Sequence, residues 1–126
     1  MARNVLGVVA GLAAWLVVTT AAGLLLRVSW PAYVRVAEAM AFTLPMMIAR
    51  LAIGAAATVV MGAVSARIAR APIAKLMSGV LLLIFFIPVH VSIWEKFPIW
   101  YHLTFLLSLV PLTYAGNRLT GRPLPA

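Results

Sequence analysis

The chain has 126 residues, of which 65% are hydrophobic and only 10% are charged, and its formal net charge is +8. A soluble domain usually carries about 25% charged residues, so this chain has too few polar side chains for a water-exposed surface, and the lipid bilayer is its predicted partner. The ten Lys and Arg residues are scattered between apolar runs, which excludes a nucleic-acid interface, and the absence of cysteine excludes disulfides, thiol nucleophiles and thiolate metal sites.

The first apolar run covers residues 5–26, between Arg3 and Arg27. A helix of this length rises about 33 Å, enough to cross a hydrocarbon core of about 30 Å. A cleaved secretory signal is the alternative, because Arg3 supplies a basic start and the small residues 19–21 offer a cleavage site. The run is longer than a usual signal core and continues past that site, which favours a retained span.

Three more spans are predicted downstream, at residues 45–66, 76–93 and 102–115. Residues 32–42 are less apolar and predict a short helix at the membrane surface, with Arg35 and Glu38 on one face. No linker divides the chain. The predicted fold is therefore all-α and polytopic: one domain over residues 1–126, a four-transmembrane-helix bundle with a short interfacial helix between the first two spans.

Charge predicts the orientation of this bundle. Four spans place both termini on one side, and that side carries more Lys and Arg than the other, which predicts an inner-membrane protein with both termini in the cytoplasm. The basic residues on the terminal side are Arg3, Arg67, Arg70, Lys75, Arg118 and Arg122. Those on the opposite side are Arg27, Arg35, Arg50 and Lys96.

Polar residues gather at the predicted non-cytoplasmic end. Trp and Tyr favour membrane interfaces in general, but this preference does not explain why every Glu and His falls at the same end. We therefore expect a site there that binds or translocates a small ligand or a lipid. Its candidate residues are Arg50, Glu38, His90, Glu95, His102, Trp100 and Tyr101.

Arg50 is the leading candidate because apolar sequence surrounds it. It begins a row of small side chains at every fourth position, a pattern typical of helix contacts, so it is predicted to face a neighbouring helix rather than lipid. The row continues with Gly54, Thr58, Gly62 and Ala66. An arginine keeps its proton, so it needs an anion or water: Glu38, Glu95, or a ligand carboxylate or phosphate. The alternative is a structural arginine that extends to the outer interface.

His90 and His102 flank the third loop and are predicted to lie at similar depth on adjacent antiparallel helices. Together with Glu95 they suggest a two-histidine, one-carboxylate metal site, but the spacing matches no metal motif. A haem held by both histidines is disfavoured because adjacent helices leave too little room. No cofactor is therefore predicted, and the simplest interpretation is hydrogen bonding at the membrane surface, with proton shuttling as a further possibility.

The segment Phe97-Pro98-Ile99-Trp100-Tyr101-His102-Leu103, followed by Ser108-Leu109-Val110-Pro111-Leu112, resembles a signature of small, uncharacterised bacterial four-helix inner-membrane proteins. The resemblance covers nearly the whole chain and implies a complete protein, but it implies no activity for any residue.

Three classes of function remain open. The first is binding or translocation of a small ligand or lipid at the outer polar end. The second is a structural or accessory subunit that forms a homo-oligomer or joins a larger membrane complex through glycine-rich helix faces, Gly7 and Gly11 among them. The third is a membrane redox or metal-dependent enzyme that uses the histidines and Glu95. Because aspartate and the usual catalytic motifs are absent from the sequence, an enzyme is disfavoured.

Overall fold

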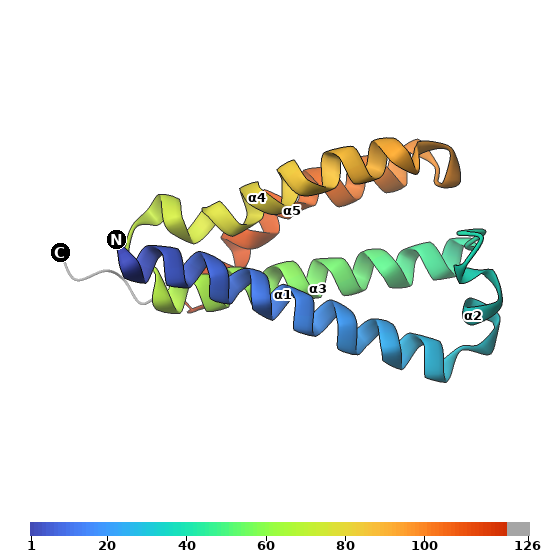
Figure 1. The fold of residues 1–126 in the computed structure, drawn as a ribbon, viewed down its shortest axis with the longest axis horizontal. Coiled ribbons are helices and arrows are strands. Elements are labelled where there is room, and N and C mark those ends of the chain that lie inside the picture. The colour runs from blue at the N-terminus through green and yellow to red at the C-terminus, as the bar shows by residue number, and fades with distance from the viewer. Residues whose placement is uncertain (121–126) are drawn as a thin grey trace.

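The computed structural model describes residues 1–120, and this part of the chain is entirely helical (Figure 1). It contains five α-helices and one short 3-10 turn, so the all-α prediction is confirmed. The elements are α1 (Ala2–Ser29), α2 (Pro31–Ala37), α3 (Leu44–Ile68), α4 (Pro72–Ser92), η1 (Trp94–Lys96) and α5 (Ile99–Thr120).

Three of these helices, α1, α3 and α4, are long and apolar enough to cross a membrane, with mean hydropathies of 2.1, 1.9 and 2.1 in their most apolar stretches. Large apolar side chains such as Leu25, Phe85 and Leu107 lie exposed on the outside of the bundle. An exposed apolar surface of this kind is unfavourable in water and favourable in lipid. Length and composition therefore indicate a membrane protein.

The helices extend beyond the predicted spans because a charged residue does not end a helix, whereas a proline does. α1 continues past Arg27 and stops two residues before Pro31, and α4 begins at Pro72, a favoured first position. A short helix, α2, is present where residues 32–42 predicted one, but it is shorter than that range. It ends at Ala37, because the following turn brings Met40 to a φ of 54°, which no helix accommodates.

The four long helices run alternately up and down, so that the N-terminus and the end of α5 share one end of the bundle (Figure 1). α3 packs against α1 and α5, and α4 packs against α5 and α1. We call the end that holds the N-terminus and the α3–α4 turn the closed end. The other end, which holds α2 and η1, is the open end, because the α1–α3 pair and the α4–α5 pair diverge toward it (Figure 1).

Small residues bring the backbones together at the closed end. A Cβ added to Gly7 would lie 2.7 Å from the Cβ of Ala69, and one added to Gly62 would collide with the carbonyl of Thr113. Thr58 and Gly62 are buried, as the four-residue spacing predicted for this face of α3. The glycine faces that the sequence offered to a partner subunit are therefore occupied inside the bundle.

The turn between α3 and α4 is held by α1. Oδ1 of Asn4 accepts the backbone N–H groups of Arg70 and Ala71, at 2.9 and 3.1 Å. In the same region the hydroxyl of Ser65 donates to the carbonyl of Gly7 at 3.1 Å. The bonds to Asn4 satisfy backbone N–H groups of the turn that would otherwise be unpaired.

Gly23, on α1 toward the open end, provides the contrast: a Cβ added there meets no atom within 4 Å. We expect Gly62→Ala to lower the free energy of unfolding by about 1–3 kcal/mol through overpacking. We expect the matched control Gly23→Ala to raise it by up to about 1 kcal/mol, because Ala favours the helix more than Gly does. Unfolding in detergent, followed by circular dichroism, measures both. Equal effects of the two variants would show that the two ends are packed alike.

Candidate ligand-binding site

A cavity of about 340 Å³ lies at the open end, between α1, α3, α4 and α5. Its volume is within the range of about 300–1,000 Å³ that is usual for small-molecule sites. Most of its wall is apolar and aromatic: Trp15, Leu26, Met40, Ile53, Phe86, Val89, Ile93 and Phe105. The polar groups that line it are few: Thr19, Tyr33, Arg50, His90 and Tyr101.

Arg50, on α3, is the charged group of this cavity. Its Nη1 donates to the hydroxyl of Tyr33 at 2.7 Å and its Nε donates to the hydroxyl of Tyr101 at 3.2 Å. Its guanidinium carbon lies 4.6 Å from the ring centre of Phe42 and 5.9 Å from that of Phe97, within the range of cation–π attraction. The guanidinium of Arg50 is thus oriented by four aromatic residues.

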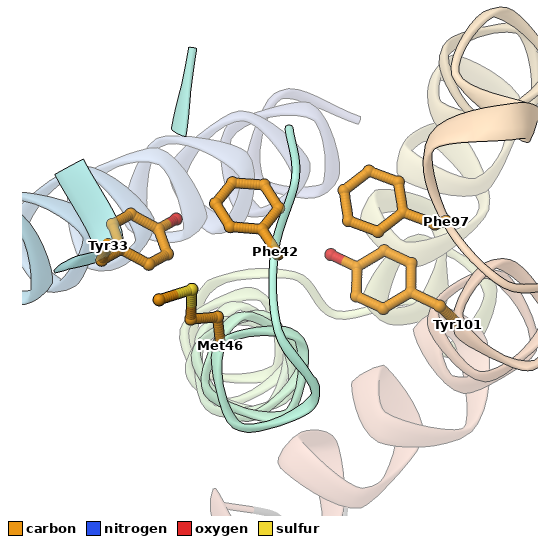
Figure 2. Packing of buried hydrophobic residues seen from close by; sticks show 5 residues of the cluster. All are labelled: Tyr33, Phe42, Met46, Phe97 and Tyr101. Carbon is orange, nitrogen blue, oxygen red and sulfur yellow. The ribbon is translucent and has the colours of Figure 1, made fainter. Parts of the chain in front are cut away.

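The aromatic residues around Arg50 form a small core of their own. Tyr33, Phe42, Phe97 and Tyr101 are all at most 8% exposed, and Phe42 stacks on Tyr33 and Phe97 with ring centres 5.1 and 5.8 Å apart. Figure 2 shows the hydroxyl oxygens of the two tyrosines pointing inward from opposite sides, with Phe42 between the two rings. Rigid packing therefore fixes both hydroxyls where Arg50 meets them.

No carboxylate is among the partners of Arg50 within residues 1–120. The sequence offered Glu38 and Glu95 for this role, but both are exposed and neither lines the cavity. Neutral hydroxyls can accept hydrogen bonds from a guanidinium but do not neutralise its charge. The remaining N–H groups of Arg50 have no protein acceptor in the described part of the chain, so the cavity contains an uncompensated positive charge.

His90 and His102 lie in contact, which confirms that they sit at similar depth on adjacent helices. Their Nδ1 atoms are 2.7 Å apart, and Nε2 of His102 lies 3.0 Å from the carbonyl oxygen of Trp94. A carbonyl only accepts, so this Nε2 carries hydrogen, and Nδ1 of a neutral His102 is then an acceptor. His90 consequently donates through Nδ1, which leaves its Nε2 without hydrogen.

The second ring nitrogen of His90, Nε2, has no hydrogen-bond partner within residues 1–120. His90 lines the cavity and is only 4% exposed. No fully buried side-chain nitrogen or oxygen within residues 1–120 lacks a hydrogen-bond partner, whereas Nε2 of His90 makes no hydrogen bond there. Nε2 is therefore accessible, and since His90 lines the cavity we infer that this nitrogen opens there, as the one basic acceptor among the lining side chains within residues 1–120.

The structure gathers part of the predicted site and separates the rest. Arg50, His90 and Tyr101 line the cavity, and His102 lies directly behind His90. Three predicted residues are exposed and do not line the cavity: Glu38 in the turn after α2, Glu95 in η1, and Trp100 in the first turn of α5.

Most residues that line the cavity were not among the predicted site residues, and Trp15 and Tyr33 are the two for which the sequence held a signal. A signal for Trp15 was available, since a tryptophan in the middle of a span lies away from the interfaces that the residue usually favours. Tyr33 gave the weaker signal that a buried tyrosine needs a partner for its hydroxyl.

Within residues 1–120 the two histidines and Glu95 are not gathered into the three-ligand set considered from the sequence. No group of three or more His, Cys, Asp or Glu residues is close enough to hold a metal within residues 1–120. Two nitrogens on one metal, each at about 2.0–2.1 Å from it, stand roughly 3.3–4 Å apart. The 2.7 Å between the Nδ1 atoms of His90 and His102 fits a shared hydrogen and leaves no room for a metal or a haem iron between them.

Comparison of the chain with family models, with curated proteins and with solved structures gives no match. A function must therefore be inferred from the chemistry of the cavity.

Proposed function

We propose that this is a four-span membrane protein that binds an amphipathic molecule with an anionic head group. The head group would bind Arg50 and the apolar tail would lie in the cavity. The observation that carries the proposal is the uncompensated charge of Arg50 in an otherwise apolar cavity. A cation in such surroundings is costly unless an anion or water accompanies it.

The hydrogen-bonding groups around Arg50 support an anion over a neutral or basic ligand. Tyr33 and Tyr101 each accept a bond from Arg50, so their own hydroxyl hydrogens remain available to a ligand. With the free N–H groups of Arg50, these hydrogens form a set of donors around one positive charge. Carboxylate, phosphate and sulfonate oxygens match such a set, often by a two-point contact with the guanidinium.

The walls of the cavity support an apolar tail. α1 contributes Trp15 and Leu26 to its lining, α4 contributes Phe86 and Val89, and Ile93 follows directly after the end of α4. α1 and α4 belong to the two helix pairs that diverge toward the open end (Figure 1). A ligand already dissolved in the bilayer would reach the cavity between these two helices without crossing a polar layer.

The proposal includes α5 as the fourth span and α2 as an interfacial helix. α5 has 22 residues against 21 in α4, and it runs beside α3 and α4 (Figure 1). Its lower hydropathy is explained by polar residues such as Tyr101, His102 and Thr113, which are buried inside the bundle rather than exposed to lipid. The excess of basic residues at the closed end supports a bacterial inner membrane with both termini in the cytoplasm.

Trp15 provides a direct test, because it lines the cavity. The other three tryptophans are replaced by phenylalanine, and the protein is placed in nanodiscs of unbrominated lipid. A medium-chain carboxylate with bromine on its chain should quench Trp15 fluorescence saturably, and the brominated alcohol of the same length should do so at least tenfold more weakly.

The matched control is a variant that keeps only Trp100, which is exposed and outside the cavity. It should report only partition into the bilayer, without saturation. Equal quenching of Trp15 by the alcohol and the carboxylate would contradict selection for an anion, and the absence of saturable quenching would contradict binding.

A further inference from the structure

The pair formed by His90 and His102 is the part of the site that anion binding alone does not use. Both rings are buried and held in fixed planes: His90 stacks on Phe105 with ring centres 4.8 Å apart, and His102 stacks on Trp94 with ring centres 4.5 Å apart. Their hydrogen bonds therefore keep one direction, from His90 through His102 to the carbonyl of Trp94. The outcome of this order is a basic nitrogen, Nε2 of His90, that opens on the cavity.

This arrangement can take up one proton without breaking a hydrogen bond. A proton added to Nε2 leaves the Nδ1–H of His90 donating to His102 as before. If that Nδ1 hydrogen then moves across the 2.7 Å contact, the positive charge passes to His102, which does not line the cavity. The pair is thus a proton acceptor whose outer member, His90, lines the same cavity as Arg50.

The charged and titratable groups around His90 determine when protonation of its Nε2 is favourable. Arg50 from α3, Tyr33 from α2 and Tyr101 from α5 line the same cavity, and His102 lies behind. The residues that α1 contributes are not titratable, and Glu95 is exposed outside the cavity. A second positive charge beside Arg50 is therefore unfavourable while the cavity has no anion, and an anion bound to Arg50 removes that cost.

We infer that the ligand is a carboxylic acid that leaves the bilayer in its neutral form and transfers its proton to Nε2 of His90 as its carboxylate binds Arg50. This inference rests on the proposed function. The O–H bond of the acid breaks, an N–H bond forms on His90, and no net charge enters the cavity. The route is favourable because a neutral acid dissolves readily in lipid, whereas a bare carboxylate does not.

Calorimetry in buffers of different ionisation enthalpy counts the protons exchanged on binding. Dodecyl sulfonate stays ionised at every pH used, so any proton taken up with it must go to the protein. The wild type should take up close to one proton per bound sulfonate. His90→Asn should take up none, because the amide can still donate to His102 but cannot be protonated.

His102→Asn is the matched control. Its amide oxygen can accept from His90 and its N–H can donate to the carbonyl of Trp94, so proton uptake should persist. Dodecanoic acid gives the complementary result at a pH where the bilayer-dissolved acid is protonated. The wild type should then exchange no net proton with the buffer, and His90→Asn should release one per bound acid.

A spectroscopic measurement on the wild type avoids reliance on variants that fold poorly. The chain has two histidines, so isotope labelling of histidine gives a simple NMR spectrum, in which dodecyl sulfonate should move the imidazole signals toward those of imidazolium. Unchanged histidine signals, or sulfonate binding without proton uptake, would overturn this inference and leave the proposed function standing. Failure of both probes to bind would overturn the proposed function itself.

Discussion

Arg50→Met is expected to weaken binding of the brominated carboxylate roughly 10- to 150-fold, the equivalent of losing charged hydrogen bonds of about 1.5–3 kcal/mol. The guanidinium is the one positive charge among the residues that line the cavity within residues 1–120. Methionine has a comparable length and fills similar space without a charge. Quenching of Trp15 measures the loss, with Arg35→Met as control, because Arg35 lies exposed on α2 and should not affect binding.

The same variant should keep or increase its thermal stability. Removing a charge that has no anionic partner relieves the cost of keeping that charge out of water. Tyr33 and Tyr101 lose a hydrogen-bond donor in this variant, but both residues still line the cavity. Weaker binding together with unchanged or higher stability is the result expected if Arg50 serves binding at a cost in stability. A loss of about 3–5 kcal/mol of stability in Arg50→Met, the value typical of breaking a buried charged pair, would instead show that Arg50 serves to hold the helices together.

Gly23→Leu is expected to weaken binding of the same probe by tenfold or more without destabilising the protein. Gly23 lines the cavity, and a Cβ placed on it meets no atom within 4 Å, so a leucine side chain has free space to occupy. That space is part of the volume that the apolar tail would need. Leucine also favours a helix more than glycine does, which adds up to about 1 kcal/mol to the free energy of unfolding.

Gly23→Ala is the graded control for this prediction, since a single methyl group fills much less of the cavity and should leave binding close to that of the wild type. Trp15 quenching and detergent unfolding test both variants. Undiminished binding by Gly23→Leu would show that the tail does not lie beside α1. Because Arg50 concerns the head group and Gly23 the tail, the two substitutions test separate halves of the proposed site.

Local sequence patterns were enough to predict the positions of the helices and which face of α3 is buried. Apolar runs predicted three helices that the structure shows to be long and apolar enough to span a bilayer, and prolines set their ends, as Pro31 and Pro72 do. The row of small residues after Arg50 predicted the buried face of α3, which includes Gly54 and Gly62. Hydrophobicity, proline geometry and helical spacing act over a few residues, so they can be read along the chain.

The relative depth of two residues on either side of one turn could also be predicted from the sequence. His90 and His102 were predicted at equal depth because they flank a short connection between antiparallel helices, and their Nδ1 atoms are in contact. Glu95, between them in the sequence, does not line the cavity. Glu95 lies in the turn itself, and spacing along the chain does not tell which side of a turn faces the bundle.

Only the tertiary structure decided what surrounds Arg50. Its partners, Tyr33 and Tyr101, are 17 and 51 residues away in the sequence, and their hydroxyls converge because Phe42 and Phe97 pack between the helices that carry them. The sequence alone made carboxylates the expected partners, since charge pairing needs no knowledge of distance. The cavity likewise depends on the whole bundle: glycine contacts close one end, aromatic rings hold the other apart, and neither helix of a pair encodes that difference by itself.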